Sequence, residues 1–156
     1  MGTSTTNRDI EYLKSVFKKN GHKKPVGPSQ VAKDLDVSRA GSLKKLKRLA
    51  KQGFGEYINS RGLILNKQGI KRIKDEMERH HIVEDFFLNR LDIELEVSCE
   101  ESKKIAPLLS KEVLEEAKKM SSYERDYDCE FNPKKEMKTK NMRKCHWLKS
   151  EGIKEV

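Results

Sequence analysis

The sequence predicts a mainly α-helical protein, with an N-terminal winged helix-turn-helix followed by an all-helical dimerisation domain. Three observations support this prediction. Apolar residues recur at helical spacing in several segments between residues 7 and 120. Two short apolar runs flank a glycine-containing turn at residues 60–62, as in a β-hairpin. A proline-free stretch from residue 67 to about residue 92 repeats apolar residues at spacings of three and four, which is typical of a helix that packs against partners.

The first three helices are placed by apolar spacing and by turn residues. The first is expected over residues 7–20, and the second from about Ser29 to Leu35, after a loop with two prolines and two glycines. Ser38 is placed to cap a third helix with an apolar inward face, formed by Leu43, Leu46 and Leu49. Two short helices joined by so brief a turn indicate a helix-turn-helix.

The third helix presents cations outward, and a hairpin follows it. The outward side chains are Arg39, Lys44, Lys45, Lys47, Arg48 and Lys51. A helix in the major groove reads base edges, and a basic hairpin reaches phosphates or the minor groove. We therefore expect one set to face the groove, namely Ser38, Arg39, Ser42, Lys44 and Lys45, and another to hold phosphates or the minor groove, namely Ser29, Arg48 and Arg61. The alternative is an ordinary solvated helix face.

Charge is distributed unevenly along the chain. The 156 residues carry a net charge of +9, with fourteen Lys and Arg against five Asp and Glu in residues 1–66. A basic first half favours double-stranded DNA as the partner. No apolar run approaches the ~18 residues of a membrane span, and no signal peptide is recognisable. We expect a soluble, cytoplasmic protein that does not bind membranes, and three cysteines without scaffold spacing fit a reducing compartment.

The long helix carries two polar residues on its apolar face. The repeated positions are Ile70, Ile73, Met77, His80, Glu84, Phe87 and Leu91. His80 and Glu84 are four residues apart, so their side chains converge on one helical face. One interpretation is a His–Glu hydrogen bond, or a face that reaches solvent there. The other is a pair of metal ligands with a third ligand from elsewhere, because a buried carboxylate is costly unless it is paired or ligated.

Two further helices are expected downstream. Ser98 and Glu101 have capping-box spacing, which predicts a fifth helix from near Cys99 to just before Pro107. Ser110 would cap a sixth helix that ends near residue 120. Cys99 would then lie in a first helical turn, where thiolate is favoured, and it is a candidate soft ligand as well as a plain small buried residue.

Three stretches within residues 9–120 follow one another in the order winged helix, long helix and start of the sixth helix: PSQVAKDLDVSRAGSLKKLKRLAKQGFGEYINSRGLILNKQGIKRI, RHHIVEDFFL and LLSKEVLEE. They resemble the iron- and manganese-dependent repressors of the diphtheria toxin repressor and manganese transport regulator (DtxR/MntR) family. The resemblance implies a homodimer that binds a palindromic operator and dimerises through the helices after the wing. The family's SH3-like domain is too large for residues 121–156, so we expect a short form without it.

The family's metal ligands carry over only in part. The positions that the resemblance matches to the ancillary site hold His80, Glu84 and Cys99, with Glu11 on the first helix as a further contributor. The positions matched to the primary site on the fifth helix hold Lys103, Ala106 and Pro107, which cannot form that site. A thiolate-containing set suits Zn²⁺ better than Mn²⁺, and Fe²⁺ is a further candidate. A regulator without bound metal, in which Lys103 pairs with Glu84 or Glu100, is the alternative.

These features divide the chain into a winged-helix DNA-binding domain (7–66), a helical domain for dimerisation and metal binding (67–120), and a basic C-terminal tail (121–156). For the tail, a DNA-contacting arm, a docking helix and a mobile segment all remain open. Cys129, Cys145 and His146 form a weak candidate for a separate metal site, because they lack the usual paired spacing.

The functional hypothesis is a homodimeric, sequence-specific transcriptional repressor with a degenerate primary metal site. The alternative is a metal-independent or non-specific architectural protein that binds nucleic acid through the same fold. We do not expect an enzyme, because the sequence offers no nucleophile–base pair, phosphate-binding glycine loop or supported acid pair.

Overall fold

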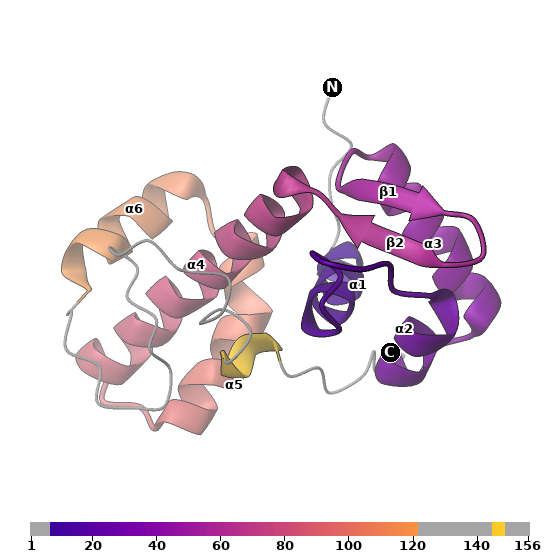
Figure 1. Ribbon diagram of the computed structural model, residues 1–156. Coiled ribbons are helices and arrows are strands. Elements are labelled where there is room, and N and C mark those ends of the chain that lie inside the picture. The colour runs from indigo at the N-terminus through magenta and orange to yellow at the C-terminus, as the bar shows by residue number, and fades with distance from the viewer. Residues whose placement is uncertain (1–6, 122–144, 149–156) are drawn as a thin grey trace. The chain divides into compact units, whose positions relative to one another are not determined.

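The computed structural model describes residues 7–121 and 145–148 of the chain. These residues form two compact units, with the boundary between Ile73 and Lys74, inside a long helix. Leu148 groups with the first unit and Trp147 with the second. Figure 1 shows the helices and strands of both units.

The first unit is a three-helix domain with a β-hairpin. Its elements are α1 (Asn7–Lys18), α2 (Pro28–Leu35), α3 (Arg39–Lys51), β1 (Gly55–Ile58) and β2 (Gly62–Leu65). Helix α1 packs against α2, α3 and β2, and both strands lie beside α3. Fully buried side chains from all three helices and β2 form the core: Leu13, Phe17, Leu35, Leu46, Leu49 and Leu63.

The turn between α2 and α3 follows from two local features. Asp36 ends α2 in the left-handed region, with φ 53°, which turns the chain sharply. Ser38 then caps α3, because its side-chain oxygen accepts a hydrogen bond from the Gly41 amide at 3.0 Å. The expected helix-turn-helix is present, with Ser38 as its cap.

The two strands of the hairpin are antiparallel, and the chain at Val26 pairs with the outer side of β2. Gly55 pairs with Leu65, and Ile58 with Gly62. Val26 bridges to Leu63 through two backbone hydrogen bonds of 2.9 and 3.0 Å. Gly62 has φ 121°, and a Cβ there would lie 2.0 Å from the Val26 carbonyl oxygen, so only glycine fits this position.

The second unit is helical. Helix α4 (Lys67–Arg90) begins in the first unit and continues into the second, where α5 (Leu95–Ile105), η1 (Ala106–Leu108) and α6 (Lys111–Met120) follow. A buried cluster holds this unit together and consists of Ile82, Val83, Ala106 and Leu114, with Phe87, Ile105, Leu109 and Ala117 packed against it. The short helix η2 (His146–Leu148) comes from the C-terminal region.

Three expected boundaries differ from the structure. Helix α1 ends at Lys18, because Asn20 adopts φ 65°. Helix α5 begins at Leu95, before the expected start near Cys99. Ser98 is no cap but lies buried inside α5, where its hydroxyl donates to the Ile93 carbonyl at 3.1 Å. Leu91 lies just beyond the end of α4 and is 52% exposed.

The predicted fold class is confirmed: the described residues form a winged helix-turn-helix followed by a helical unit. Ser110 caps α6 through a bond from the Val113 amide at 3.3 Å, as expected. None of the helices in residues 7–121 and 145–148 is long and apolar enough to cross a membrane.

Candidate nucleic-acid interface and metal centre

The outer face of α3 carries most of the exposed cations that the sequence indicated. Arg39, Lys44, Arg48 and, on the hairpin turn, Arg61 are exposed, together with the hydroxyl-bearing residues Ser29 and Ser38. The Arg39 Nε donates to the Ser29 Oγ at 3.1 Å, which joins the first turn of α2 to that of α3. This surface can offer cations to an array of phosphates.

A buried carboxylate from α1 lies beneath two of these cations. Asp9 is 0% exposed, and its Oδ1 accepts from the Lys45 Nζ at 2.8 Å. The Arg48 guanidinium is 3.8 Å from the Asp9 Oδ2. Asp9 therefore fixes Lys45 against the domain, a role that the sequence analysis missed. An acidic residue in the first turn of a helix is common, so its sequence position gives no signal of this contact.

Ser42 does not face outward. It is 0% exposed in the isolated chain, inside the packing of α3. The expectation that its side chain points into a groove is wrong, because α3 turns this position toward the core.

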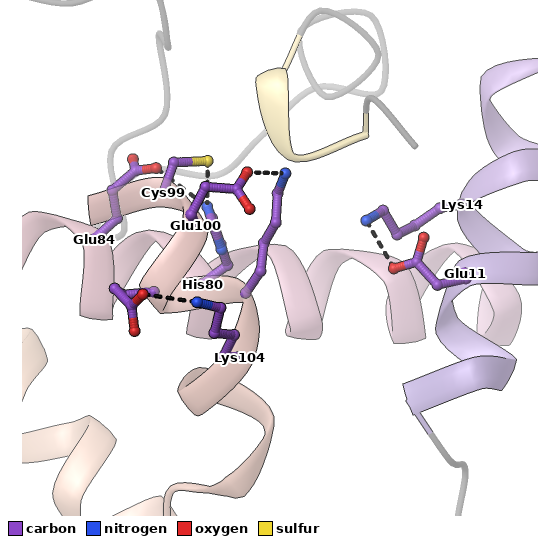
Figure 2. Close-up of polar contacts among 9 residues, drawn as sticks. Glu11, Lys14, His80, Glu84, Cys99, Glu100 and Lys104 are labelled. Carbon is purple, nitrogen blue, oxygen red and sulfur yellow. Dashed lines mark hydrogen bonds and ion pairs between the residues drawn. The ribbon is translucent and has the colours of Figure 1, made fainter. Parts of the chain in front are cut away.

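His80 and Glu84 meet on α4 as the spacing indicated. The His80 Nε2 lies 3.1 Å from the Glu84 Oε2, and the two residues are only 1% and 3% exposed. Figure 2 shows that one ring nitrogen of His80 faces both this carboxylate and the Cys99 thiol. The expectation of a solvent-exposed pair is thereby excluded, and the buried pair remains compatible with either a hydrogen bond or a metal.

Cys99 reaches the same histidine from α5. Its Sγ lies 3.5 Å from the His80 Nε2 and is buried. Burial, and then the negative charge of Glu84, raise the pKa of the Cys99 thiol to about 12. The expectation that a helix start favours thiolate here is wrong, because Cys99 is not in the first turn of α5, and burial together with the charge of Glu84 favours the neutral thiol. A bound cation is what would stabilise the thiolate.

His81 is a second buried histidine at this place, and the sequence analysis missed it. The donor atoms of His80, His81 and Glu84 all lie within 4.8 Å of one another. The two imidazoles meet edge to face, with centroids 5.2 Å apart. His81 is not one of the positions that repeat at spacings of three and four along the long helix. Only its place next to His80 in the sequence could have indicated its role.

The positions matched to the family's primary metal site do not fit a metal. The Lys103 Nζ donates to the Glu100 Oε1 at 3.0 Å, which is one of the two pairings expected for it. Ala106 belongs to the buried apolar cluster, and Pro107 follows it in η1. In contrast, the His80, Glu84 and Cys99 set offers imidazole, carboxylate and thiol donors that suit Zn²⁺. Glu11 lies in the first unit on α1, where it accepts from Lys14 at 3.1 Å.

Part of the tail contacts α4. Cys145 is buried with its Sγ 3.2 Å from the His81 Nε2, and the Trp147 ring centroid is 6.3 Å from that of His80. This favours the docking interpretation for residues 145–147. Cys129, the basic residues before Cys145 and the His146 side chain lie outside the described residues, so the separate site with these residues stays a prediction.

Comparisons with known proteins agree with this architecture. Residues 4–63 match the family model described as iron dependent repressor, N-terminal DNA binding domain. The chain is 26% identical over 111 residues to an uncharacterized HTH-type transcriptional regulator of Methanocaldococcus jannaschii, covering 69% of this chain and 87% of that protein. It is 37% identical over 79 residues to the transcriptional regulator MntR of Escherichia coli, covering 51% of this chain and 49% of that protein. The chain therefore spans about half the length of MntR.

Solved structures share the fold. A hypothetical protein from Sulfolobus solfataricus has a TM-score of 0.67 at 20% identity, over 74% of this chain and 88% of that one. ScaR with bound Zn²⁺ has a TM-score of 0.63 at 20% identity, over 72% of this chain and 52% of that one. The IdeR of T. acidophilum has a TM-score of 0.58 at 19% identity, over 76% of this chain and 55% of that one.

Proposed function

Because the chain belongs to the DtxR/MntR family of metal-dependent regulators, we propose that it is a homodimeric, sequence-specific transcriptional repressor. The matched relatives that carry a functional name are transcriptional regulators and not enzymes. The observation that carries the proposal is the matched winged helix-turn-helix with exposed cations on α3 and at the hairpin turn.

The geometry supports different tasks for different cations. Arg39 and Lys44 are exposed on the first half of α3, and we infer that they contact base edges in the major groove. Arg61 is exposed on the hairpin turn, and we infer that it contacts phosphate or the minor groove. Lys45 and Arg48 share the Asp9 carboxylate, which limits how far they extend toward DNA.

Exposed apolar side chains support dimerisation through the second unit. Among the described residues, the large hydrophobic side chains that are 37–77% exposed all lie between the end of α4 and the end of α6: Leu91, Leu95, Val97, Leu108, Val113 and Met120. A second copy of the chain would cover such surface.

The metal site of the proposed repressor is His80, Glu84 and Cys99, whereas the contribution of Glu11 stays an expectation from the family resemblance alone. Lys103, Ala106 and Pro107 leave the primary site degenerate. A bound Zn²⁺, Fe²⁺ or Mn²⁺ would neutralise Glu84 and stabilise the Cys99 thiolate, and Zn²⁺ suits this donor set best.

The test is selection of DNA sequences by the purified chain, followed by footprinting of the selected DNA with the metal-loaded and the chelated protein. We expect a protected palindrome, because two copies related by a twofold axis contact two half-sites. Uniform coating of DNA would support the architectural alternative. Equal affinity before and after chelation would contradict metal-gated repression and support a metal-independent regulator.

Matched variants separate base reading from phosphate contact. Lys44→Ala and Arg39→Ala should change sequence preference, whereas Arg61→Ala should weaken binding on all sequences and reduce the slope of log affinity against log salt by about one. The same loss on every sequence for all three variants would argue against base reading by α3.

A further inference from the structure

A contact between α4 and the C-terminal region adds a second thiol to the buried metal-binding residues. Cys145 is 64 residues from His81 in sequence, yet its Sγ lies 3.2 Å from the His81 Nε2. Both side chains are buried. The family resemblance assigned no role to either residue.

The orientation of His81 is fixed from the opposite side of its ring. The Nδ1 lies 2.8 Å from the Met77 carbonyl oxygen, which can only accept, so Nδ1 carries the proton. The Nε2 that faces Cys145 is then the nitrogen with the lone pair. Histidines that bind metals are held in this way, with the second ring nitrogen donating to a carbonyl or carboxylate.

The two thiols flank two adjacent histidines. Cys99 lies 3.5 Å from the His80 Nε2, and Cys145 lies 3.2 Å from the His81 Nε2. In a tetrahedral zinc site, bond lengths of about 2.3 Å to sulfur and 2.0–2.1 Å to nitrogen separate neighbouring donor atoms by roughly 3.5 Å. Each of these two pairs is therefore spaced like two ligands of one ion. The donor atoms of His80, His81 and Glu84, which lie within 4.8 Å of one another, connect the two pairs.

We propose that Cys145 and His81 are ligands of the same metal centre as His80, Glu84 and Cys99. The site is then a thiolate-containing zinc site that ties residues 145–147 to α4. Five donors are present, and tetrahedral Zn²⁺ needs four of them, with both thiols among the four. This inference rests on the metal site of the proposed function and adds a ligand from the C-terminal region.

The chemistry of the donor set decides the class of metal. Thiolates are soft ligands, and they favour Zn²⁺ over Mn²⁺. The positive charge of Lys103, which acts on the Cys99 thiol, partly offsets the negative charge that two thiolates and a carboxylate bring to one site. A buried arrangement of this kind is favourable only when the cation is bound.

The test uses Co²⁺ as a spectroscopic substitute for Zn²⁺ on the full chain, freed of metal and kept reduced. Thiolate ligands of Co²⁺ give a near-ultraviolet charge-transfer band whose intensity grows with the number of thiolates. We expect Cys145→Ser to lose about half of this band, and Zn²⁺ affinity in competition with a chromophoric chelator to fall by about tenfold or more.

Two comparisons make the assignment specific. Cys129→Ser removes the third cysteine and should keep the full band and affinity; a loss equal to that of Cys145→Ser would overturn the assignment. His81→Gln keeps a group that can donate to the Met77 carbonyl, and it should weaken Zn²⁺ binding with the helical circular dichroism unchanged. Unchanged Zn²⁺ affinity in this variant would overturn the role of His81.

A measurement on the wild-type chain covers the case in which a variant fails to fold. Zn²⁺ should slow alkylation of Cys145 and Cys99 together, as followed by mass spectrometry of the two peptides. Protection of Cys99 alone would overturn the inference.

The outcomes separate this inference from the proposed function. A Co²⁺ band that is present and unchanged in Cys145→Ser overturns the role of Cys145 and leaves the His80, Glu84 and Cys99 site in place. If the wild-type chain binds no Co²⁺ or Zn²⁺, the inference and metal-gated repression both fail, whereas DNA binding by the winged helix is unaffected.

Discussion

At the level of single residues, the setting of Lys45 on α3 depends on a carboxylate from another helix. Asp9 is fully buried and accepts from Lys45 at 2.8 Å. A hydrogen bond between charged groups is stronger than a neutral one, and its loss leaves a buried group without compensation. Asp9 therefore stabilises the fold and also reduces the number of cations available to DNA.

Asp9→Asn should lower the free energy of unfolding by about 1.5–3 kcal/mol, measured by urea denaturation. It should also raise affinity for non-specific DNA and steepen its salt dependence, because Lys45 becomes available to phosphate. Asp36→Asn is the matched control: it removes the same charge from an exposed position, and asparagine tolerates its left-handed backbone. If both variants lose the same free energy of unfolding, the ion pair between Asp9 and Lys45 contributes nothing beyond the loss of one negative charge.

Local spacing in the sequence predicted some of the side-chain contacts and not others. The His80–Glu84 pair was predictable, because two positions four apart on a helix must face the same way. The burial of Ser42 was not, since six nearby cations made the whole face of α3 look exposed. The contact of His81 with Cys145 depends on a segment 64 residues away, which no local spacing encodes.

At the level of elements, the hairpin depends on one glycine. Gly62 combines φ 121° with a carbonyl oxygen where its Cβ would be, whereas Gly53 has φ 90° and open space around it. Backbone strain alone costs about 1–3 kcal/mol, and Gly62 has a backbone clash in addition.

Gly62→Ala should therefore destabilise the first unit more than Gly53→Ala, as measured by thermal unfolding. It should also displace Arg61 and weaken DNA binding, because the two strands must separate from Val26 to make room. Equal melting temperatures for the two variants would show that the close approach to Val26 is dispensable.

The end of α1 is joined to α2 by an ion pair that titrates. Burial raises the pKa of Asp34, but hydrogen bonding and attraction from Lys18, with attraction from Lys19, outweigh burial and hold the pKa below its ordinary value. The Lys18 Nζ is 2.9 Å and the Lys19 Nζ 3.4 Å from the Asp34 Oδ1. A lowered folded-state pKa means that the stabilisation is complete above the unfolded-state pKa and disappears as pH falls through the folded-state pKa.

Asp34→Asn should accordingly cost about 0.5–1 kcal/mol of unfolding free energy at pH 7 and nothing in strong acid. Urea denaturation from neutral to strongly acidic pH, with wild type and variant side by side, measures this. A constant difference at all pH values would assign the effect to packing and not to the ion pair.

At the level of the whole molecule, exposed charge and exposed apolar surface lie on different units. Exposed cations gather on α3 and the hairpin, and the large exposed hydrophobic side chains of the described residues gather in the second unit. This distribution suits a protein that binds DNA with one unit and a second copy of itself with the other.

Light scattering should therefore give the mass of a dimer for the wild-type chain. Leu108→Glu, at a 77% exposed position, should shift the mass toward that of a monomer without unfolding the chain, because a carboxylate cannot be buried cheaply in an apolar interface. Lys111→Glu, on the exposed side of α6, is the control that changes charge nearby and should leave the mass unaltered.

The sequence by itself determined the elements and their order: local spacing specifies an amphipathic helix, a glycine specifies the hairpin turn, and a serine specifies the cap of α3. The start of α5 was predicted too late, because Ser98 has the spacing of a helix cap but lies within the helix, where its hydroxyl donates to the Ile93 carbonyl. Only the tertiary structure decided that Asp9 lies under Lys45 and that Cys145 meets His81. These contacts join segments far apart in the chain, so they depend on how the elements pack and not on any local pattern of residues.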